Sequence, residues 1–238
     1  MRFAGSWRAM VVRGVRVSAA EGPEVAVDVP AAPPEAVEVF GTALPDVERY
    51  VARLAGDGVA RGLIGPREVP RLWDRHVLNS VAVGDAVPHG ARVVDVGSGA
   101  GLPGIPLALA RPDLTLTLVE PMARRVEFLE EVVTELGMPW RVVRGRAEER
   151  SVVRAVGPVD VVTARAVAPL PRLVGWCLGL LRPGAQLVTL VGARALQELP
   201  TLVPELERAG MRDVHALAVG GGLGAAATTV VVMTRGGR

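Results

Sequence analysis

A run of glycines follows an acidic residue in the stretch Val93–Pro106, which reads VVDVGSGAGLPGIP. The residues before the glycines are β-branched apart from Asp95, and such a segment is typical of a buried strand. At Gly97, Gly99 and Gly101 the backbone can approach a ligand where a Cβ atom would clash. A strand, a glycine turn and a helix start in this order predict a ligand pocket at the carboxyl ends of the strands of an α/β sheet.

The acid at the end of this strand favours S-adenosylmethionine (SAM) over a dinucleotide as the ligand. A dinucleotide requires backbone N–H groups and a helix N-terminus directed at its anionic pyrophosphate. SAM carries no phosphate, and Asp95 can face its amino-acid half, where the same carboxylate would crowd a pyrophosphate. Residues 99–104 also satisfy the G-x-G-x-x-G pattern, so a dinucleotide and a tight turn without a ligand remain alternatives at this point.

Two further strand ends carry residues suited to the same ligand. Glu120 ends the next predicted strand, where a carboxylate lies beside the ribose in open α/β sheets and accepts its hydroxyl protons. Ala147 and Glu148 follow the third strand, where the loop passes the adenine edge, and the backbone N–H or the side chain of Glu148 can read the base. Glu148 also suits the start of a helix, where the helix dipole favours an acid, and both roles are compatible.

Arg165 follows the fourth predicted strand, in the loop Thr163–Leu170, over which the target group of a methyl transfer arrives. Methyltransferases that act on exocyclic amines often carry Asn-Pro-Pro-Tyr or Asp-Pro-Pro-Tyr there, with carbonyl groups that accept the amine protons. The arginine argues against amine methylation. We expect Arg165 to hold the SAM carboxylate, a phosphate or the face of a base; a surface arginine is the alternative.

Strands and helices alternate from Arg92 onward, which predicts a parallel α/β sheet. The predicted strands are Arg92–Val96, Leu114–Glu120, Arg141–Arg144, Val159–Thr163, Gln186–Val191, Asp213–Ala218 and Thr228–Thr234. The predicted helices are Ile105–Ala110, Met122–Leu136, Ala147–Ala155, Pro169–Leu181 and Ala193–Ala209. A short glycine-rich loop, Gly220–Gly224, makes the last two strands an antiparallel hairpin. Seven strands with this hairpin indicate the Rossmann-like sheet of SAM-dependent methyltransferases.

The chain before the sheet is predicted to have two parts. Residues 1–33 are rich in Ala, Pro and Glu toward their end and are expected to be a disordered lead-in. Residues 34–90 form an N-terminal helical extension, with helices over Asp46–Ala60 and Pro70–Val83. Residues 91–238 form the SAM-binding domain.

The composition of the 238 residues narrows the function classes further. The 27 residues counted as Lys or Arg are all arginine, so no Schiff base or lysine general base can form. A net charge of +2 does not by itself imply a nucleic-acid partner. The single Cys177 cannot form an internal disulfide, which fits a reducing, cytoplasmic compartment. We expect no metal site and no membrane span.

Four stretches of the chain resemble one family, the bacterial small-subunit ribosomal RNA guanine-N7 methyltransferases, also called glucose-inhibited division protein B. They are Leu72–Ser80, Asp95–Pro106, Arg124–Leu129 and Arg165-Ala166. The likeness covers the chain from Pro34 to Thr234. The Gly-Leu-Pro-Gly-Ile-Pro extension of the glycine motif and the Arg-His pair in the first stretch are specific, whereas the bare glycine motif is not.

The resemblance implies methyl transfer from SAM to N7 of a guanine in the 530 loop of 16S ribosomal RNA. The partner is then 16S rRNA or the small ribosomal subunit, and we expect the protein to act as a monomer. The resemblance also suggests cofactor contacts at Gly97, Leu102, the Ala147-Glu148 pair and Arg165.

The chemistry at guanine N7 explains why we assign no catalytic residue. N7 has a free lone pair at neutral pH, so no proton leaves before it attacks the methyl group and no general base is needed. Catalysis then depends on in-line positioning, and the base has to leave its stack to reach the pocket. Arg75, His76 and Arg165 are expected to engage RNA or the cofactor carboxylate, with a core position as the alternative for His76.

The chain departs from the family pattern at two places. The stretch 62–65, Gly-Leu-Ile-Gly, stands where many members carry Asn-Leu-Thr, and Val191-Gly192 stands where many carry Lys-Gly. Any contact made by that lysine is absent, so weaker activity or an arginine substitute such as Arg194 is expected.

Other function classes fit the sequence less well. A small-molecule SAM-dependent methyltransferase, the main alternative, would share the sheet but usually covers its pocket with a lid, and no insertion after the fifth strand is long enough for one. A nicotinamide oxidoreductase with a Ser/Tyr/Lys site is excluded because the chain has no lysine. A non-catalytic RNA-binding module would not require the glycines and both acids of the pocket.

Overall fold

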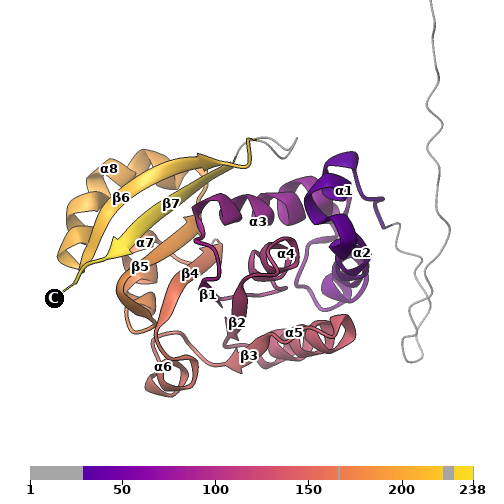
Figure 1. Ribbon diagram of the computed structural model, residues 1–238, viewed down its shortest axis with the longest axis horizontal. Helices are drawn as coiled ribbons and strands as arrows, with labels where there is room; N and C mark the ends of the chain where they lie inside the picture. The colour runs from indigo at the N-terminus through magenta and orange to yellow at the C-terminus, as the bar shows by residue number, and fades with distance from the viewer. Residues whose placement is uncertain (1–28, 166, 222–227, 238) are drawn as a thin grey trace, which may run out of the picture.

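A seven-stranded sheet runs through the protein, as the computed structural model shows (Figure 1). The structure describes residues 29–165, 167–221 and 228–237. The strand order is β3-β2-β1-β4-β5-β7-β6, and β7 is antiparallel to both of its neighbours while the other pairs are parallel. This arrangement confirms the predicted sheet and its terminal hairpin. The predicted disordered lead-in lies outside the described residues as far as residue 28.

The bounds of the elements place the predicted ligand-binding residues at strand ends. The strands are β1 (Arg92–Val96), β2 (Thr115–Glu120), β3 (Arg141–Arg144), β4 (Val159–Arg165), β5 (Leu181–Leu190), β6 (Met211–Val219) and β7 (Thr228–Arg235). The α-helices are α1 (Pro34–Phe40), α2 (Leu44–Arg53), α3 (Asn79–Ala82), α4 (Gly104–Ala110), α5 (Ala123–Leu136), α6 (Arg150–Val156), α7 (Leu170–Cys177) and α8 (Ala193–Arg208).

Successive residues along the strands belong to two different hydrophobic clusters. Val93 of β1 packs with the N-terminal helices, α4 and α5, whereas its neighbour Val94 packs with α6, α7 and α8. Val161 and Val162 of β4 divide in the same way. Because side chains alternate across a strand, both faces of the sheet are covered by helices. The central strands β1 and β4 are accordingly buried over most of their length, whereas most residues of the edge strand β6 are exposed.

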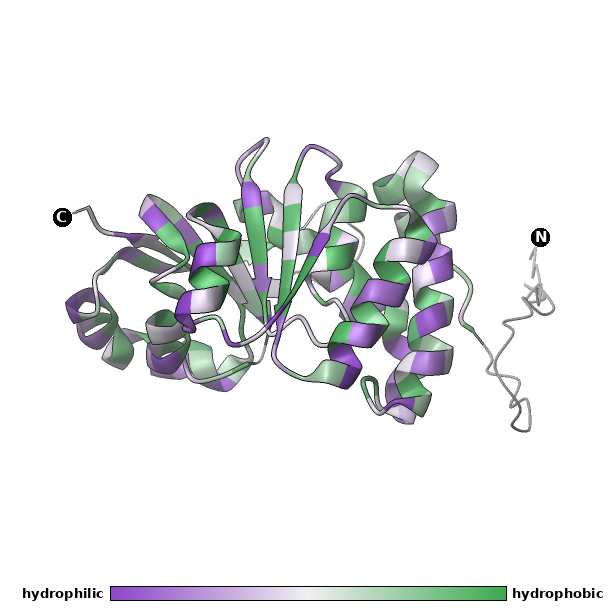
Figure 2. Cartoon of the chain, turned by 90° about the horizontal axis from the view of Figure 1, so that it is seen from below, coloured by the Kyte–Doolittle hydropathy of each residue, from purple (hydrophilic) through white to green (hydrophobic). Residues whose placement is uncertain are grey.

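The predicted extension is folded against the sheet as part of the first of these clusters. Tyr50, Leu54 and Leu72 from the extension are fully buried there together with Ile105 of α4 and Phe128 of α5. Figure 2 shows hydrophilic and hydrophobic residues on the same helices, as expected of helices with one face on a core. The helices α1, α2 and α3 of the extension therefore pack on α4 and α5, which cover this face of the sheet.

Several boundaries differ from the predicted ones. The helix predicted over Asp46–Ala60 is α2 (Leu44–Arg53) followed by a π-helical segment (Leu54–Gly58), and the helix predicted from Ala147 begins at Arg150. The helix predicted to reach Leu181 ends at Cys177, and β5 begins at Leu181 rather than at Gln186. The Arg182-Pro183-Gly184 stretch, which is typical of a turn, lies within β5 because Leu181 pairs with Val159 before a shift in register. The helix predicted over residues 70–83 consists of a 3₁₀ segment (η3, Pro66–Arg71), a π-helical segment (η4, Leu72–Leu78) and α3.

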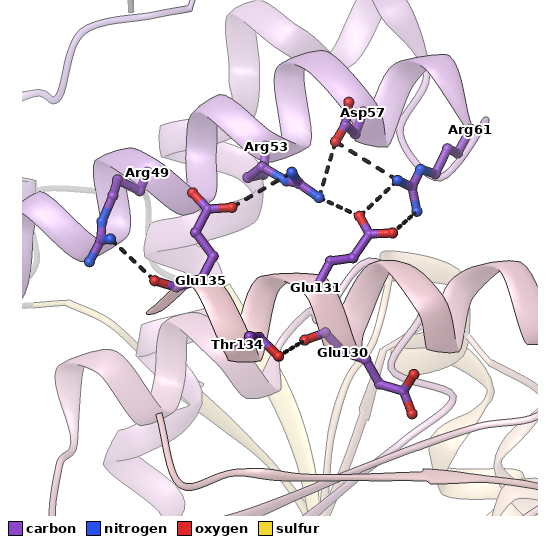
Figure 3. A network of polar contacts seen from close by, with 8 residues as sticks. All are labelled: Arg49, Arg53, Asp57, Arg61, Glu130, Glu131, Thr134 and Glu135. Carbon is purple, nitrogen blue, oxygen red and sulfur yellow. Dashed lines mark hydrogen bonds and ion pairs between the residues drawn. The ribbon is translucent and has the colours of Figure 1, made fainter. Parts of the chain in front are cut away.

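A network of charged side chains joins the extension to α5 (Figure 3). Glu131 of α5 accepts two hydrogen bonds from Arg61, at 3.0 and 2.7 Å, and one from Arg53 at 2.5 Å. Both guanidinium carbons also lie 5.9 Å from the centre of the Phe128 ring, a distance at which cation–π attraction acts. Glu131 of α5 is thus the anion that Arg53 and Arg61 of the extension share.

Replacing Glu131 by glutamine is expected to lower the free energy of unfolding by about 1 kcal/mol, because exposed ion pairs each contribute about 0.2–1 kcal/mol and Glu131 joins two arginines. The loss should shrink at high salt, which screens the wild-type pairs. Urea denaturation at low and high salt measures both effects. Glu130→Gln is the matched control, since the Glu130 side chain points away from the network in Figure 3. Equal losses for the two variants would contradict this role of Glu131.

Candidate cofactor pocket

A cavity of about 370 Å³ opens at the carboxyl ends of β1, β2 and β4. Its walls are the glycine loop after β1, the residues after β2 and β3, and Arg165 at the end of β4. Leu63 and Ile64, from the stretch that departs from the family pattern, also line it. Most of the predicted cofactor-binding residues meet here; they are Gly97, Gly99, Leu102, Glu120, Ala147, Glu148 and Arg165.

The glycine loop holds a backbone shape that side chains would prevent. Gly97 has a φ of +68°, and a Cβ atom there would lie 2.8 Å from Cγ1 of Val167. Gly101 has a φ of +97°, and a Cβ atom there would overlap the side chain of Ile105. Gly101 itself is outside the cavity lining, so its glycine serves the packing of the loop on α4.

Glu120 fixes the loop from the neighbouring strand. Its side chain is almost fully buried and lines the cavity. One carboxylate oxygen accepts the Gly99 N–H and the other accepts the Met122 N–H, each at 3.0 Å. Arg125 forms an ion pair with it at 3.6 Å. The free lone pairs of this carboxylate are the acceptors available to a ribose in the cavity.

Asp95 lies behind the glycine loop and is not among the residues that line the cavity. Its Oδ2 atom accepts the Gly104 N–H at 3.2 Å, at the start of α4, while Oδ1 has no hydrogen-bond partner among the described residues. Burial raises the pKa of this carboxyl to about 7. We expected the Asp95 carboxyl to face the amino-acid half of SAM. Instead, the carboxyl is bonded to the start of α4 and does not line the cavity.

Arg165, the last residue of β4, lines the cavity. Its Nη1 atom donates to Nδ1 of His76 at 3.0 Å, and Nε2 of His76 lies 2.8 Å from Oε2 of Glu68. His76 is buried and outside the cavity lining, whereas Arg75 is exposed and pairs with Glu68 at 3.2 Å. Both predicted RNA-binding residues thus lie next to the cavity wall rather than in it.

Ala147 and Glu148 line the cavity before α6 begins at Arg150. Since Glu149 is the residue that caps α6, Glu148 lies before the helix and not in its first turn. Arg194, the possible substitute for the missing lysine, is exposed and pairs with Glu198 at 2.9 Å, outside the cavity lining.

Two residues of this region escaped the sequence analysis. Tyr50 of α2 is fully buried, and its hydroxyl donates to the Ala100 carbonyl at 2.7 Å, which ties the extension to the glycine loop. The only tyrosine of the chain, placed in an apolar helix face, was a usable signal. Glu68 contacts His76 from eight residues earlier. In one regular helix, residues eight apart are separated by about 12 Å along the axis, so the sequence spacing does not predict this contact.

No group of three or more His, Cys, Asp or Glu side chains within the described ranges is arranged to hold a metal ion. Among the helices of the same residues, none has the length and apolar character needed to cross a membrane.

Comparison with known proteins gives consistent matches. A model of the family described as rRNA small subunit methyltransferase G matches residues 43–222. The chain is 57% identical over 190 residues to ribosomal RNA small subunit methyltransferase G of Mycobacterium sp. (strain KMS), which covers 80% of this chain and 84% of the relative. It is 53% identical over 207 residues to the protein of the same name from Streptomyces avermitilis, which covers 87% and 86%.

Solved structures show the same fold at low sequence identity. The mitomycin 7-O-methyltransferase MmcR aligns with a TM-score of 0.55 and 19% identity, over 84% of this chain and 67% of that one. A SAM-dependent methyltransferase from Aquifex aeolicus aligns with a TM-score of 0.52 and 16% identity, over 75% and 97%. At such identities the likeness shows a shared fold.

The buried carboxyl of Asp95 predicts a specific pH dependence of stability. Its pKa is about 7 in the folded chain and near 3.8 when exposed, so between these values the folded chain keeps a proton that the unfolded chain releases. This contribution to stability is lost as the pH rises through about 7. Asp95→Asn removes the titration and keeps an oxygen for the Gly104 N–H. We expect the unfolding free energy of the variant, relative to wild type, to rise between about pH 5 and pH 8. Urea denaturation across this range measures it, and a constant difference would contradict the assignment.

Proposed function

The chain belongs to the rRNA small subunit methyltransferase G family, and on that premise we propose that it transfers the methyl group of SAM to N7 of a guanine in the 530 loop of 16S ribosomal RNA. The observation that carries the proposal is the cavity at the carboxyl ends of β1, β2 and β4, which combines a glycine loop, a buried carboxylate and an arginine. A ribosomal RNA substrate favours action in the cytoplasm. That the protein acts as a monomer stays a prediction.

The residues of the cavity fit the parts of SAM. Glu120 offers carboxylate lone pairs to ribose hydroxyl groups, and Ala147 and Glu148 form the wall expected beside the adenine. Arg165 offers guanidinium N–H donors to the carboxylate of the amino-acid end. The glycine loop, where a Cβ atom at Gly97 would meet Val167, keeps the backbone close to the ligand between these two charged ends. Bound SAM supplies a methyl group activated by the sulfonium.

The residues of the chain then act by binding and orientation. Guanine N7 attacks with a lone pair, so the protein removes no proton, and the transfer leaves a positive charge on the methylated base. The described cavity offers the buried carboxylate of Glu120 and the partly buried guanidinium of Arg165 for holding the cofactor, and neither is required as a base. Holding the two reactants in line contributes roughly 7–11 kcal/mol when the attack geometry is achieved. Arg75, exposed beside this wall, is proposed to contact the RNA.

Methyl transfer from labelled SAM to small ribosomal subunits that lack this modification tests the proposal. We expect the label to appear in 7-methylguanosine after nucleoside digestion, at a position in the 530 loop. Naked 16S rRNA, assayed in parallel, decides which form is the substrate. If no label entered the RNA although the protein bound SAM, the result would point to a small-molecule substrate and overturn the rRNA assignment.

Arg165→Ala is expected to weaken SAM binding by about tenfold to a hundredfold, because hydrogen bonds to charged groups contribute roughly 1.5–3 kcal/mol. Methyl transfer should fall with it. Calorimetric titration with SAM measures the affinity, and Arg154→Ala, an exposed arginine of α6, is the control that should bind as the wild type does. An Arg165→Ala variant with full affinity and full activity would show that the proposed contact is wrong.

A further inference from the structure

We propose that Glu68 and His76 are positioning residues, which orient the guanidinium of Arg165 toward the amino-acid end of the cofactor. The inference rests on the proposed contact between Arg165 and the SAM carboxylate. Three side chains form a connected series of hydrogen bonds, from Glu68 outside the cavity through His76 to Arg165 in the cavity wall.

The three residues come from three separate segments. Arg165 ends β4, His76 lies in η4, and Glu68 lies in η3. Their contacts are short, with 3.0 Å from Arg165 Nη1 to His76 Nδ1 and 2.8 Å from His76 Nε2 to Glu68 Oε2. The His76 side chain is 10% exposed, so water does not replace either contact readily.

The direction of both hydrogen bonds follows from the chemistry of the groups. A guanidinium only donates, so Nδ1 of His76 has to be the unprotonated acceptor. The ring hydrogen of the neutral imidazole then lies on Nε2, which donates to the Glu68 carboxylate. Burial and the Arg165 charge lower the pKa of His76, which favours this neutral form. The same hydrogen bond lowers the pKa of Glu68 and keeps it a charged acceptor.

The orientation matters because a second group attracts the same guanidinium. Asp95 interacts electrostatically with Arg165, and its buried Oδ1 atom has no hydrogen-bond partner among the described residues. Glu68 selects the His76 tautomer that accepts from Arg165, and so leaves the other donors of the guanidinium for the cavity.

This arrangement also decides between the two roles predicted for His76. Both ring nitrogens are engaged, one with Arg165 and one with Glu68, and the ring is buried. An RNA contact through the ring would require breaking one of these hydrogen bonds. His76 is therefore assigned to the support of Arg165, and the exposed Arg75 remains the RNA-binding candidate of the pair.

Binding of two ligands to the full chain, without RNA, tests the inference. S-adenosylhomocysteine carries the amino-acid end, whereas 5′-deoxy-5′-methylthioadenosine lacks it. We expect Glu68→Gln to weaken binding of S-adenosylhomocysteine by roughly threefold to tenfold, the range of one hydrogen bond, and to leave binding of methylthioadenosine unchanged. Asp74→Asn, which removes the same charge from an exposed neighbour in η4, is the matched control and should change neither affinity.

A second pair of variants separates positioning from folding. In His76→Asn the amide oxygen can replace Nδ1 as the acceptor for Arg165 without help from Glu68. We therefore expect near wild-type affinity for S-adenosylhomocysteine, and no further effect when Glu68→Gln is added. Equal weakening of both ligands by Glu68→Gln, or no weakening of either, would overturn the inference. If Arg165→Ala fails to discriminate between the ligands, the proposed Arg165 contact itself is wrong, and the rRNA assignment is unaffected.

Discussion

The glycine loop after β1 must present its backbone to a ligand while its own polar groups lie away from water, and the rest of the site depends on how this requirement is met. Glu120 accepts the Gly99 N–H from one side, and the Tyr50 hydroxyl donates to the Ala100 carbonyl from the other. Unpaired, the buried Ala100 carbonyl alone would cost about 1–3 kcal/mol. The loop is therefore stable in its open shape only when β2 and the extension are both in place.

This dependence explains why the N-terminal extension cannot be regarded as an appendage to a standard sheet. It buries Tyr50 against the loop, contributes Leu63 and Ile64 to the cavity, and holds His76 and Glu68 behind Arg165. The ion pairs of Glu131 join the same segment to α5. The sheet supplies the strand ends that SAM-binding folds share, and the extension supplies the groups that fix their backbone and side chains.

The sequence was sufficient for what depends on local pattern. Alternating apolar strands and helices predicted the sheet and its hairpin, and strand ends predicted that Glu120, Ala147 and Arg165 meet in one cavity. Contacts between distant segments, such as Arg165 with His76, follow from packing that no spacing encodes. The same holds for the start of β5, where pairing of Leu181 with Val159 outweighs the turn preference of Pro183-Gly184. The carboxyl of Asp95 was expected in the cavity because the sequence places Asp95 at the end of a strand. The sequence did not indicate that the Gly104 N–H would bind this carboxyl outside the cavity.

The contacts that shape the cavity close long loops of the chain. The Tyr50–Ala100 hydrogen bond spans 50 residues and the Arg165–His76 hydrogen bond spans 89. Because closing a long loop costs chain entropy, we expect such contacts to form late in folding. Interactions that form after the transition state act mainly on the unfolding rate. A ligand held by this cavity thus slows unfolding of the protein and scarcely accelerates its folding. The protein is then expected to resist degradation better when the cofactor is abundant.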